Sequence, residues 1–266
     1  MELNDKKFAV LIDADNISHR KIKDILDEIA NYGTPTIKRI YGDFTNPKFA
    51  AWKEVLLENS ITPIQQYAYT TGKNATDSAL IIDAMDILYA GNVEGFCLVS
   101  SDSDFTRLAS RLREAGKIVV GMGEKKTPSP FIAACNKFKY LEVLQQEGEE
   151  EAAAECQERK CAEKSEGAAP STAQTSLREI RRAVRTIIDD SSEDDDQWVP
   201  LSTVGNTLIK RFPEFDVRNY GHRKLTSFVK SLDAFEVREV PNPTDDNTKK
   251  IYVRTRPGNR NNKKNR

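Results

Sequence analysis

Short apolar runs alternate with amphipathic stretches along the first half of the chain. The runs at 8–12 and 95–99 are continuously apolar, as are strands that are buried on both faces of a parallel sheet. Between such runs, apolar residues recur three and four positions apart, which predicts helices that bury one face. We expect strands at 8–12, 36–41, 62–68, 95–99 and 118–121, helices at 18–31, 47–58, 76–89 and 105–115, a last helix from Ser129, and an edge strand at 140–144.

This alternation of strands and helices over about 140 residues predicts an α/β domain. Consecutive parallel strands that are joined by helices need right-handed crossovers, so helices cover both faces of the sheet. In such sheets the ligand site lies beyond the carboxyl ends of the strands. Polar residues that directly follow the predicted strands are therefore the leading candidates for chemistry.

The pattern breaks at 146–175, where the chain is rich in Glu and then in Ala, Ser, Gly and Pro, without apolar periodicity. Such a stretch is typical of a linker. Order returns over 176–255, where three helical patterns, the second capped by Ser202, precede a hairpin, as in a winged helix. We therefore predict domains at 6–145 and 176–255, an acidic low-complexity linker at 146–175, and a basic, disordered tail at 256–266.

The net charge of −1 hides a segregation of charge along the chain. Residues 1–145 carry 18 basic and 19 acidic side chains, and residues 146–175 carry 3 and 8, so these parts have net charges of −1 and −5. Residues 176–266 carry 19 and 14, a net charge of +5. A basic C-terminal part suits an anionic partner, although charge that only keeps the protein soluble gives the same pattern.

Composition argues against several kinds of site. The four cysteines and the two histidines, His19 and His222, share no metal-ligand spacing, so neither a zinc site nor a disulfide framework is expected. The N-terminus lacks the apolar core of a signal peptide, and no apolar run approaches the ~20 residues that span a bilayer. We expect a reduced, soluble, cytoplasmic protein without a membrane partner.

Acidic side chains follow two of the predicted strands and open one predicted helix. The carboxyl ends of parallel strands meet at one edge of the sheet, and this helix begins near the same edge. These side chains can therefore converge on one pocket. They are Asp13 and Asp15 after the first strand, Asp102 and Asp104 after the fourth, and Asp77 at the start of the helix at 76–89.

Carboxylates that gather in one pocket require a cation or a proton. Two carboxylates about 4 Å apart repel by ~4 kcal/mol at an effective dielectric constant of ~20, so without a counter-ion one of them takes up a proton. Hard cations prefer oxygen ligands, which makes Mg²⁺ or Mn²⁺ the expected cofactor. Such an ion can activate water for phosphodiester hydrolysis. The plainer alternative is that these residues only cap helices: Ser101, Asp102 or Ser103 the helix after the fourth strand, and Asp15 or Ser18 the first helix.

Four motifs in a fixed order carry a resemblance to a known family. They are residues 11–16 (LIDADN), 74–83 (NATDSALIID), 99–105 (VSSDSDF) and 120–123 (VGMG). Together they resemble the NYN domains of the PIN-like nuclease superfamily, and also its LabA-like branch, over residues 6–145. The resemblance implies an α/β fold with a PIN-like parallel sheet flanked by helices, and a metal-dependent endoribonuclease.

The same resemblance assigns roles to the acidic residues. Asp15 occupies a position that is often not acidic in the family, so the resemblance leaves its role open. Asp83 is a weaker candidate, because it lies about 240° around the helix axis from the residue that opens the helix. The residues implied to be catalytic and to bind the metal are Asp13, Asp77, Asp102 and Asp104.

Three further residues of this domain are expected near the substrate. The resemblance implies that Asn16 is a supporting polar group, and Ser101 contributes a hydroxyl beside the acidic cluster. Lys73 and the backbone N–H groups of its loop can hold a phosphate, although an ordinary loop fits that stretch equally well.

The second predicted domain also resembles a family. The motifs are residues 198–201 (WVPL), 212–216 (FPEFD) and 220–225 (YGHRKL). Followed by a predicted wing, they look like an OST-HTH or LOTUS domain over 176–255, which implies RNA binding or docking to a protein. Four basic residues lie near the third predicted helix and can neutralise phosphates, although they also fit a solvated helix face: Arg218, Arg223, Lys224 and Lys230.

We therefore expect a metal-dependent ribonuclease that cleaves RNA by metal-activated water, with a C-terminal domain that binds RNA. A first alternative is an RNA-binding regulator without catalysis. A second is a phosphatase of the haloacid-dehalogenase type, because Asp13 and Asp15 imitate the Asp-x-Asp start of that class. The sequence leaves open a protein partner for the C-terminal domain, a homodimer, and the choice between RNA and DNA.

Overall fold

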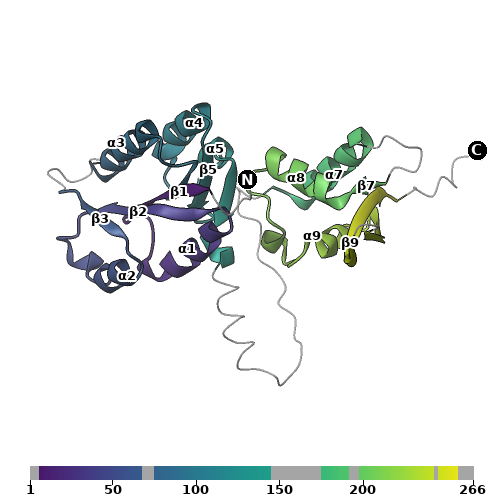
Figure 1. Ribbon diagram of the computed structural model, residues 1–266, viewed down its shortest axis with the longest axis horizontal. Coiled ribbons are helices and arrows are strands. Elements are labelled where there is room, and N and C mark those ends of the chain that lie inside the picture. Colours follow the sequence, from purple (N-terminus) through teal and green to yellow (C-terminus); the bar gives the residue numbers. More distant parts are fainter. Residues whose placement is uncertain (1–5, 68–74, 145–174, 192–197, 243–244, 257–266) are drawn as a thin grey trace, which may run out of the picture. The chain divides into compact units, whose positions relative to one another are not determined.

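The computed structural model describes residues 6–67, 75–144, 175–191, 198–242 and 245–256 (Figure 1). The described residues form two compact units, one that ends before residue 175 and one that begins there. Each unit has a hydrophobic core of its own. None of the described helices is both long and apolar enough to cross a lipid bilayer.

A six-stranded parallel sheet forms the centre of the first unit. Its order is β3-β2-β1-β4-β5-β6. The strands are β1 (Lys7–Asp13), β2 (Thr34–Gly42), β3 (Thr62–Gln65), β4 (Gly95–Val99), β5 (Ile118–Gly123) and β6 (Lys137–Tyr140). The helices are α1 (Ile22–Ala30), α2 (Trp52–Glu58), α3 (Ala75–Ala90), α4 (Thr106–Glu114) and α5 (Ser129–Ala134), with short 3-10 turns at η2 (His19–Lys21), η3 (Pro47–Phe49) and η4 (Ser103–Phe105).

Helices cover both faces of this sheet, as the strand–helix alternation predicts. Helices α3, α4 and α5 pack on one face, where Leu80, Leu108 and Phe131 are buried together (Figure 1). Helices α1 and α2 pack on the other face around Ile25 and Trp52. Because both faces are covered, β1 and β4 read as continuous apolar runs rather than as alternating ones.

The winding of the chain reverses between β1 and β4. From β1 the chain runs outward through β2 to β3, returns through α3 to β4, and then runs outward on the other side through β5 to β6. Strands β1 and β4 pair directly, with Ile12 beside Val99 at their carboxyl ends. A reversal of this kind opens a crevice where ligands bind in open α/β sheets.

Some predicted element bounds in this unit are wrong. The edge strand β6 lies at 137–140 and not at 140–144, because Phe138 and Tyr140 alternate with lysines and turn inward, while residues 141–144 are helical. The predicted helix at 47–58 is divided into η3 and α2. Strand β3 ends at Gln65, and the predicted strand end at Ala68 lies outside the described residues.

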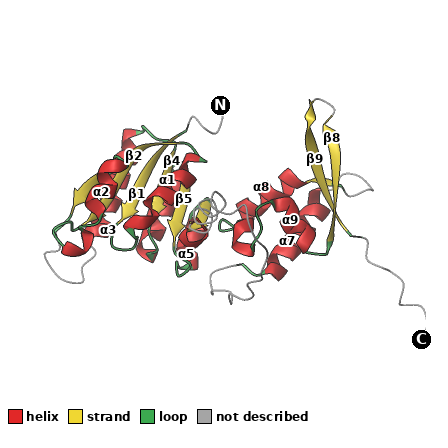
Figure 2. Ribbon diagram, turned by 90° about the horizontal axis from the view of Figure 1, so that it is seen from below, coloured by secondary structure: helices red, strands yellow, loops and turns green. Residues whose placement is uncertain are grey.

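The second unit combines three helices with a small antiparallel sheet (Figure 2). The helices are α7 (Leu177–Ser191), α8 (Leu201–Arg211) and α9 (Leu225–Ser231), with a 3-10 turn at η5 (Val217–Tyr220). The strands are β7 (Val199–Pro200), β8 (Phe235–Asn242) and β9 (Asp245–Thr255), in the order β7-β9-β8. This is the predicted winged-helix arrangement, with β7 as an additional strand.

The core of the second unit forms where the helices meet the sheet. Val184, Leu208 and Phe228 come from three different helices and are buried with Val253 of β9. The predicted cap of the second helix is wrong. Pro200 occupies the N-cap position of α8, and Ser202 is the second residue of the helix.

Candidate functional site

Asp13 ends β1, beside the carboxyl end of β4, and is only 1% exposed. Its Oδ1 accepts a hydrogen bond from the backbone N–H of Asp15 (3.0 Å), and its Oδ2 accepts from Asn16 Nδ2 (2.5 Å) and from Ser100 Oγ (2.8 Å). Burial raises the pKa of Asp13, and the hydrogen bonds from Asn16 and Ser100 act in the opposite direction. Asn16 thus supports Asp13 in the structure.

The turn after β4 holds the next two aspartates. Asp102 occupies the N-cap position of η4, where its Oδ1 accepts from the backbone N–H of Asp104 (2.9 Å). The backbone N–H of Asp102 donates in turn to Ser100 Oγ (3.1 Å). Asp102 therefore fills the capping role that was weighed as the plainer alternative. One carboxylate can still cap and bind a cation, because each of its oxygens accepts more than one partner.

Three carboxylates meet at the edge of the sheet. Asp77, in the first turn of α3, offers an oxygen that lies with oxygens of Asp102 and Asp104, all within 4.8 Å of one another. Burial, and after it the charges of Asp13, Asp102 and Asp104, raise the pKa of Asp77 to about 6. Asp13 thus acts electrostatically on this group, which we call the aspartate triad (Asp77, Asp102 and Asp104).

The triad has the dimensions and the chemistry of a site for a hard cation. Oxygens that bind one ion at about 2.0–2.6 Å lie no more than ~5 Å from one another, and the oxygens of the triad satisfy that limit. The pKa of Asp77 is raised first by burial and then by repulsion from the neighbouring carboxylates, and a bound cation would offset both effects. The residues present therefore fit Mg²⁺ or Mn²⁺.

Two other acidic residues of this domain have different partners. Asp15 pairs with Lys48 Nζ (2.6 Å) on the surface. Asp83 accepts hydrogen bonds from Arg39 Nη1 and from the hydroxyl of Tyr41. Asp83 therefore ties α3 to β2, which gives it a structural part in the domain.

A second layer of contacts supports the turn after β4. Ser101 is buried, and its Oγ accepts from the backbone N–H of Glu124 (2.8 Å). Glu124 pairs with Lys126 (2.9 Å) and Lys21 (3.6 Å), and its bond to Lys126 is the main cause that lowers its pKa. The hydroxyl of Ser101 thus connects the turn to β5, while Lys73 lies outside the described residues.

The sequence did not single out Ser100 as a site residue. Ser100 is 1% exposed and its hydroxyl joins two site elements, since it donates to Asp13 and accepts from the N–H of Asp102. A usable signal was present. A hydroxyl residue directly after a buried strand lies at the same sheet edge as an aspartate that ends the neighbouring strand.

The C-terminal candidates differ in their surroundings. Arg218 is half-buried and makes a two-pronged pair with Asp216, through Nη2 (2.7 Å) and Nε (3.0 Å). This pair reduces the charge that Arg218 offers to a phosphate. Arg223 and Lys224 are exposed before α9.

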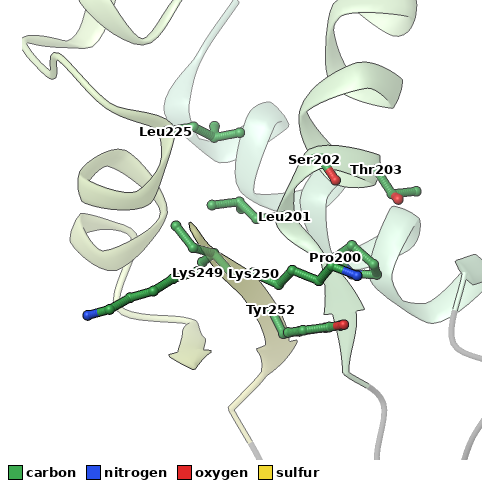
Figure 3. A pocket seen from close by; sticks show the side chains of 9 residues that line it. Pro200, Leu201, Ser202, Thr203, Leu225, Lys249, Lys250 and Tyr252 are labelled. Carbon is green, nitrogen blue, oxygen red and sulfur yellow. The ribbon is translucent and has the colours of Figure 1, made fainter. Parts of the chain in front are cut away.

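A cavity of about 620 Å³ lies in the same unit between the start of α8, Leu225 of α9 and β9 (Figure 3). Its lysines are Lys249 and Lys250 of β9. The side chain of Lys249 extends away from Pro200 and Leu201 in Figure 3 and pairs with Glu239 (3.4 Å). The cavity contains none of the aspartates described above.

The parallel sheet and its acidic edge define a PIN-like α/β domain. The sequence matches the NYN domain family over residues 7–142, about half of the chain, and the chain belongs to that family. Residues 172–245 match the OST-HTH/LOTUS domain family. Both resemblances drawn from the motifs are confirmed, and together the two families support a role in nuclease chemistry and RNA binding. The boundaries at 6–145, 146–175, 176–255 and 256–266 stay predictions.

Several solved structures are similar to parts of the chain. A crystal structure of a protein of unknown function from Vibrio parahaemolyticus is 19% identical, with a TM-score of 0.43, and covers 52% of this chain and 94% of that one. An NMR structure of an uncharacterized protein of Nitrosomonas europaea is 33% identical (TM-score 0.27, 38% of this chain, 91% of that one). A second NMR structure, from Chromobacterium violaceum, is 32% identical (TM-score 0.23, 32% and 85%). No curated protein matches the chain.

Proposed function

We propose that the NYN domain is a metal-dependent endoribonuclease whose site is the aspartate triad together with Asp13. The observation that carries the proposal is the meeting of carboxylate oxygens of Asp77, Asp102 and Asp104 within 4.8 Å of one another. Such a cluster is unfavourable by itself and favourable around a cation. Membership of the NYN family supports phosphodiester hydrolysis as the reaction.

Asp77, Asp102 and Asp104 are the residues that would hold Mg²⁺ or Mn²⁺, with Asp13 beside them. When bound, a divalent ion makes water a stronger nucleophile and offsets the charge that builds on the phosphate oxygens. Asp77 must release its proton to bind a cation, and a pKa of about 6 means that the cation competes with that proton when the pH is at or below about 6. Asn16 and Ser100 hold both the position and the ionised form of Asp13.

The geometry of Asp13 disfavours the phosphatase alternative. A covalent mechanism needs a carboxylate oxygen that can reach a phosphorus atom. The carboxylate of Asp13 is buried, and three hydrogen bonds engage its two oxygens. Asp13 is therefore better suited to shape the field of the site than to attack a substrate.

The OST-HTH/LOTUS domain supports RNA as the substrate class. Residues 176–266 carry a net charge of +5, so this part of the chain attracts a polyanion. We infer that it captures RNA for the nuclease domain in the cytoplasm. A protein partner for this domain and a homodimer stay predictions.

A cleavage assay tests the proposal. Matched labelled RNA and DNA strands are incubated with the full chain in Mg²⁺, in Mn²⁺ and in EDTA. We expect endonucleolytic RNA products that need the ion and that fall by a factor of at least ~100 in Asp102→Asn. Asp86→Asn is the matched control, because Asp86 is exposed on α3, outside the triad. RNA binding without turnover in either ion would instead favour the non-catalytic regulator.

A further inference from the structure

A shallow cavity of about 530 Å³ lies at the end of the small sheet in the OST-HTH/LOTUS unit, where α9 leads into β8 and β9 ends. Its walls include Trp198, Lys230, Glu236, Arg238 and Arg256. We call these residues, together with Arg254, which lies over the ring of Trp198, the wing pocket. Of these residues, only Lys230 was predicted from the sequence to contact phosphates. The hairpin of β8 and β9 that carries the pocket projects beside α9 in Figure 2.

The fold brings the walls together from four segments. Trp198 directly precedes β7, whose Val199 pairs with Val253 of β9. Arg254 of β9 pairs in turn with Glu236 of β8. The backbone N–H of Arg256 donates to the carbonyl of Ala234 (2.9 Å), which keeps the end of β9 beside the start of β8.

The wing pocket carries an excess of positive charge. The carboxylate of Glu236 is held by Arg254, through Nη2 (2.7 Å) and Nε (2.8 Å), so these two charges offset each other. Lys230, Arg238 and Arg256 are exposed, and no ion pair within the described ranges involves them. Three positive charges therefore face one cavity without a described counter-charge.

An aromatic ring completes the pocket. The guanidinium of Arg254 lies over the ring of Trp198, 4.7 Å from its centroid, and Glu236 fixes that guanidinium from the other strand. A planar platform of this kind can stack with a nucleobase, because every base has a π-face. Cations around a stacking platform are the combination that single-stranded nucleic acid requires.

The other basic groups of this unit are less suited to the task. Arg218 is neutralised by Asp216, and Lys249 of the cavity in Figure 3 pairs with Glu239. Helix α7 presents the exposed arginines Arg178, Arg181, Arg182 and Arg185, which line neither the cavity in Figure 3 nor the wing pocket.

We propose that the wing pocket binds single-stranded RNA, with an unpaired base stacked at Trp198 and adjacent phosphates on Lys230, Arg238 and Arg256. The inference rests on the proposed role of this domain in RNA capture and assigns the surface that performs it. An unpaired strand is the expected ligand, because a base inside a duplex must first be unpaired and unstacked, at a cost, before it can stack on a protein ring.

The test is equilibrium binding of a labelled single strand of RNA to the full chain in EDTA, where the proposed cleavage reaction is stopped. We expect Lys230→Gln/Arg256→Gln to weaken binding about tenfold and to reduce the salt dependence of log K by ~1.4, since two phosphate contacts are lost. We expect Trp198→Ala to weaken binding about fivefold or more, and Trp198→Phe to retain most of the affinity. Thermal unfolding of each variant shows whether it is folded.

Arg178→Gln/Arg181→Gln is the matched control, because it removes the same charge from the exposed face of α7. An equal loss of affinity in this control, or unchanged binding by Lys230→Gln/Arg256→Gln, overturns the inference while wild-type binding and cleavage leave the proposed function intact. Tighter binding of duplex RNA or of single-stranded DNA also overturns it. A wild-type chain that binds no RNA removes the RNA-capture role itself, whereas loss of cleavage alone leaves the wing pocket untouched.

Discussion

Ser100 Oγ donates a hydrogen bond of 2.8 Å to Asp13 Oδ2 and so joins the carboxyl ends of β4 and β1. The same hydroxyl accepts the backbone N–H of Asp102, at 3.1 Å. One buried side chain therefore sets the position of the carboxylate that ends β1 and of the turn that carries Asp102 and Asp104. The hydroxyl of Ser100 therefore contributes both to the packing of β1 against β4 and to the arrangement of the acidic site.

Replacing Ser100 by Ala removes a donor to a buried carboxylate. We expect Ser100→Ala to lower the free energy of unfolding by about 1.5–3 kcal/mol, and to reduce RNA cleavage because Asp13 and Asp102 lose their shared anchor. Urea unfolding and initial cleavage rates measure the two effects. Ser103→Ala, on the exposed side of η4, is expected to change stability by no more than ~0.5 kcal/mol. Equal stability of both variants would show that the Ser100 hydroxyl has no such role.

The pKa of Asp77 predicts a pH-dependent stability in the protein without metal. In the folded chain this pKa rises from 3.8 to about 6, so the folded state binds the proton more tightly than the unfolded state. Stability from this group is therefore highest below pH 4 and is lost as the pH rises through 6. Because Asp77 is partly exposed, solvent screening reduces the effect, and we expect about 1 kcal/mol.

Asp77→Asn removes that cost. In EDTA we expect the variant to be more stable than wild type by about 1 kcal/mol at pH 8, and to match wild type near pH 4. Mn²⁺ is expected to raise the melting temperature of wild type but much less that of the variant. The measurements are urea unfolding at both pH values and thermal unfolding with and without Mn²⁺, with Asp86→Asn as control. A variant that is less stable at pH 8 without metal would contradict the assignment.

Asp83 is expected to matter for stability and not for chemistry. It accepts hydrogen bonds from Arg39 and from the buried Tyr41, whose pKa is raised by burial and by this bond. We expect Asp83→Asn to cost about 1–3 kcal/mol of unfolding free energy, because the two donors lose a charged acceptor. Cleavage per folded molecule should stay within a factor of two of wild type. A loss of cleavage as large as that of Asp102→Asn would place Asp83 in the site after all.

A side chain at position 123, at the end of β5, is expected to disturb the acidic site sterically. A Cβ atom here would lie 2.6 Å from the carbonyl oxygen of Ser100 and 2.6 Å from Thr127 Oγ1. We expect Gly123→Ala to destabilise the domain by about 1–3 kcal/mol, and to lower cleavage because the backbone at Ser100 must move. At Gly91 a Cβ would meet no atom within 4 Å, and only its φ of +71° opposes a side chain. Gly91→Ala should therefore cost about 1 kcal/mol and leave cleavage unchanged.

The sequence predicts the interior of this fold better than its edges. Strands β1 and β4 are buried on both faces, so their apolar runs identify them without knowledge of their neighbours. Strand β6 lies at the edge of the sheet and alternates Lys and aromatic residues. Apolar helical residues follow it directly, so the sequence pattern does not show where the strand ends. Local pattern is sufficient where burial is complete, but an edge strand also needs knowledge of its partner.

The same limit applies to the candidate site. The topology rule places the strand ends together, and the structure brings Asp77, Asp102 and Asp104 within bonding reach of one centre. The hydrogen bond between Asp83 and Arg39 of β2, and the ion pair between Arg218 and Asp216, depend on the conformations of long side chains in the packed structure. Spacing along the chain does not contain that information.

The pairing of β1 with β4 also sets when the aspartate site can form during synthesis. Ser100 lies 87 positions after Asp13, with two further strands and their helices in between. During synthesis Asp13 therefore leaves the ribosome long before Ser100 and the other residues that surround it in the folded domain. The aspartate site is therefore incomplete in a nascent chain that ends before Ser100, and it can form only after most of the NYN domain has been made.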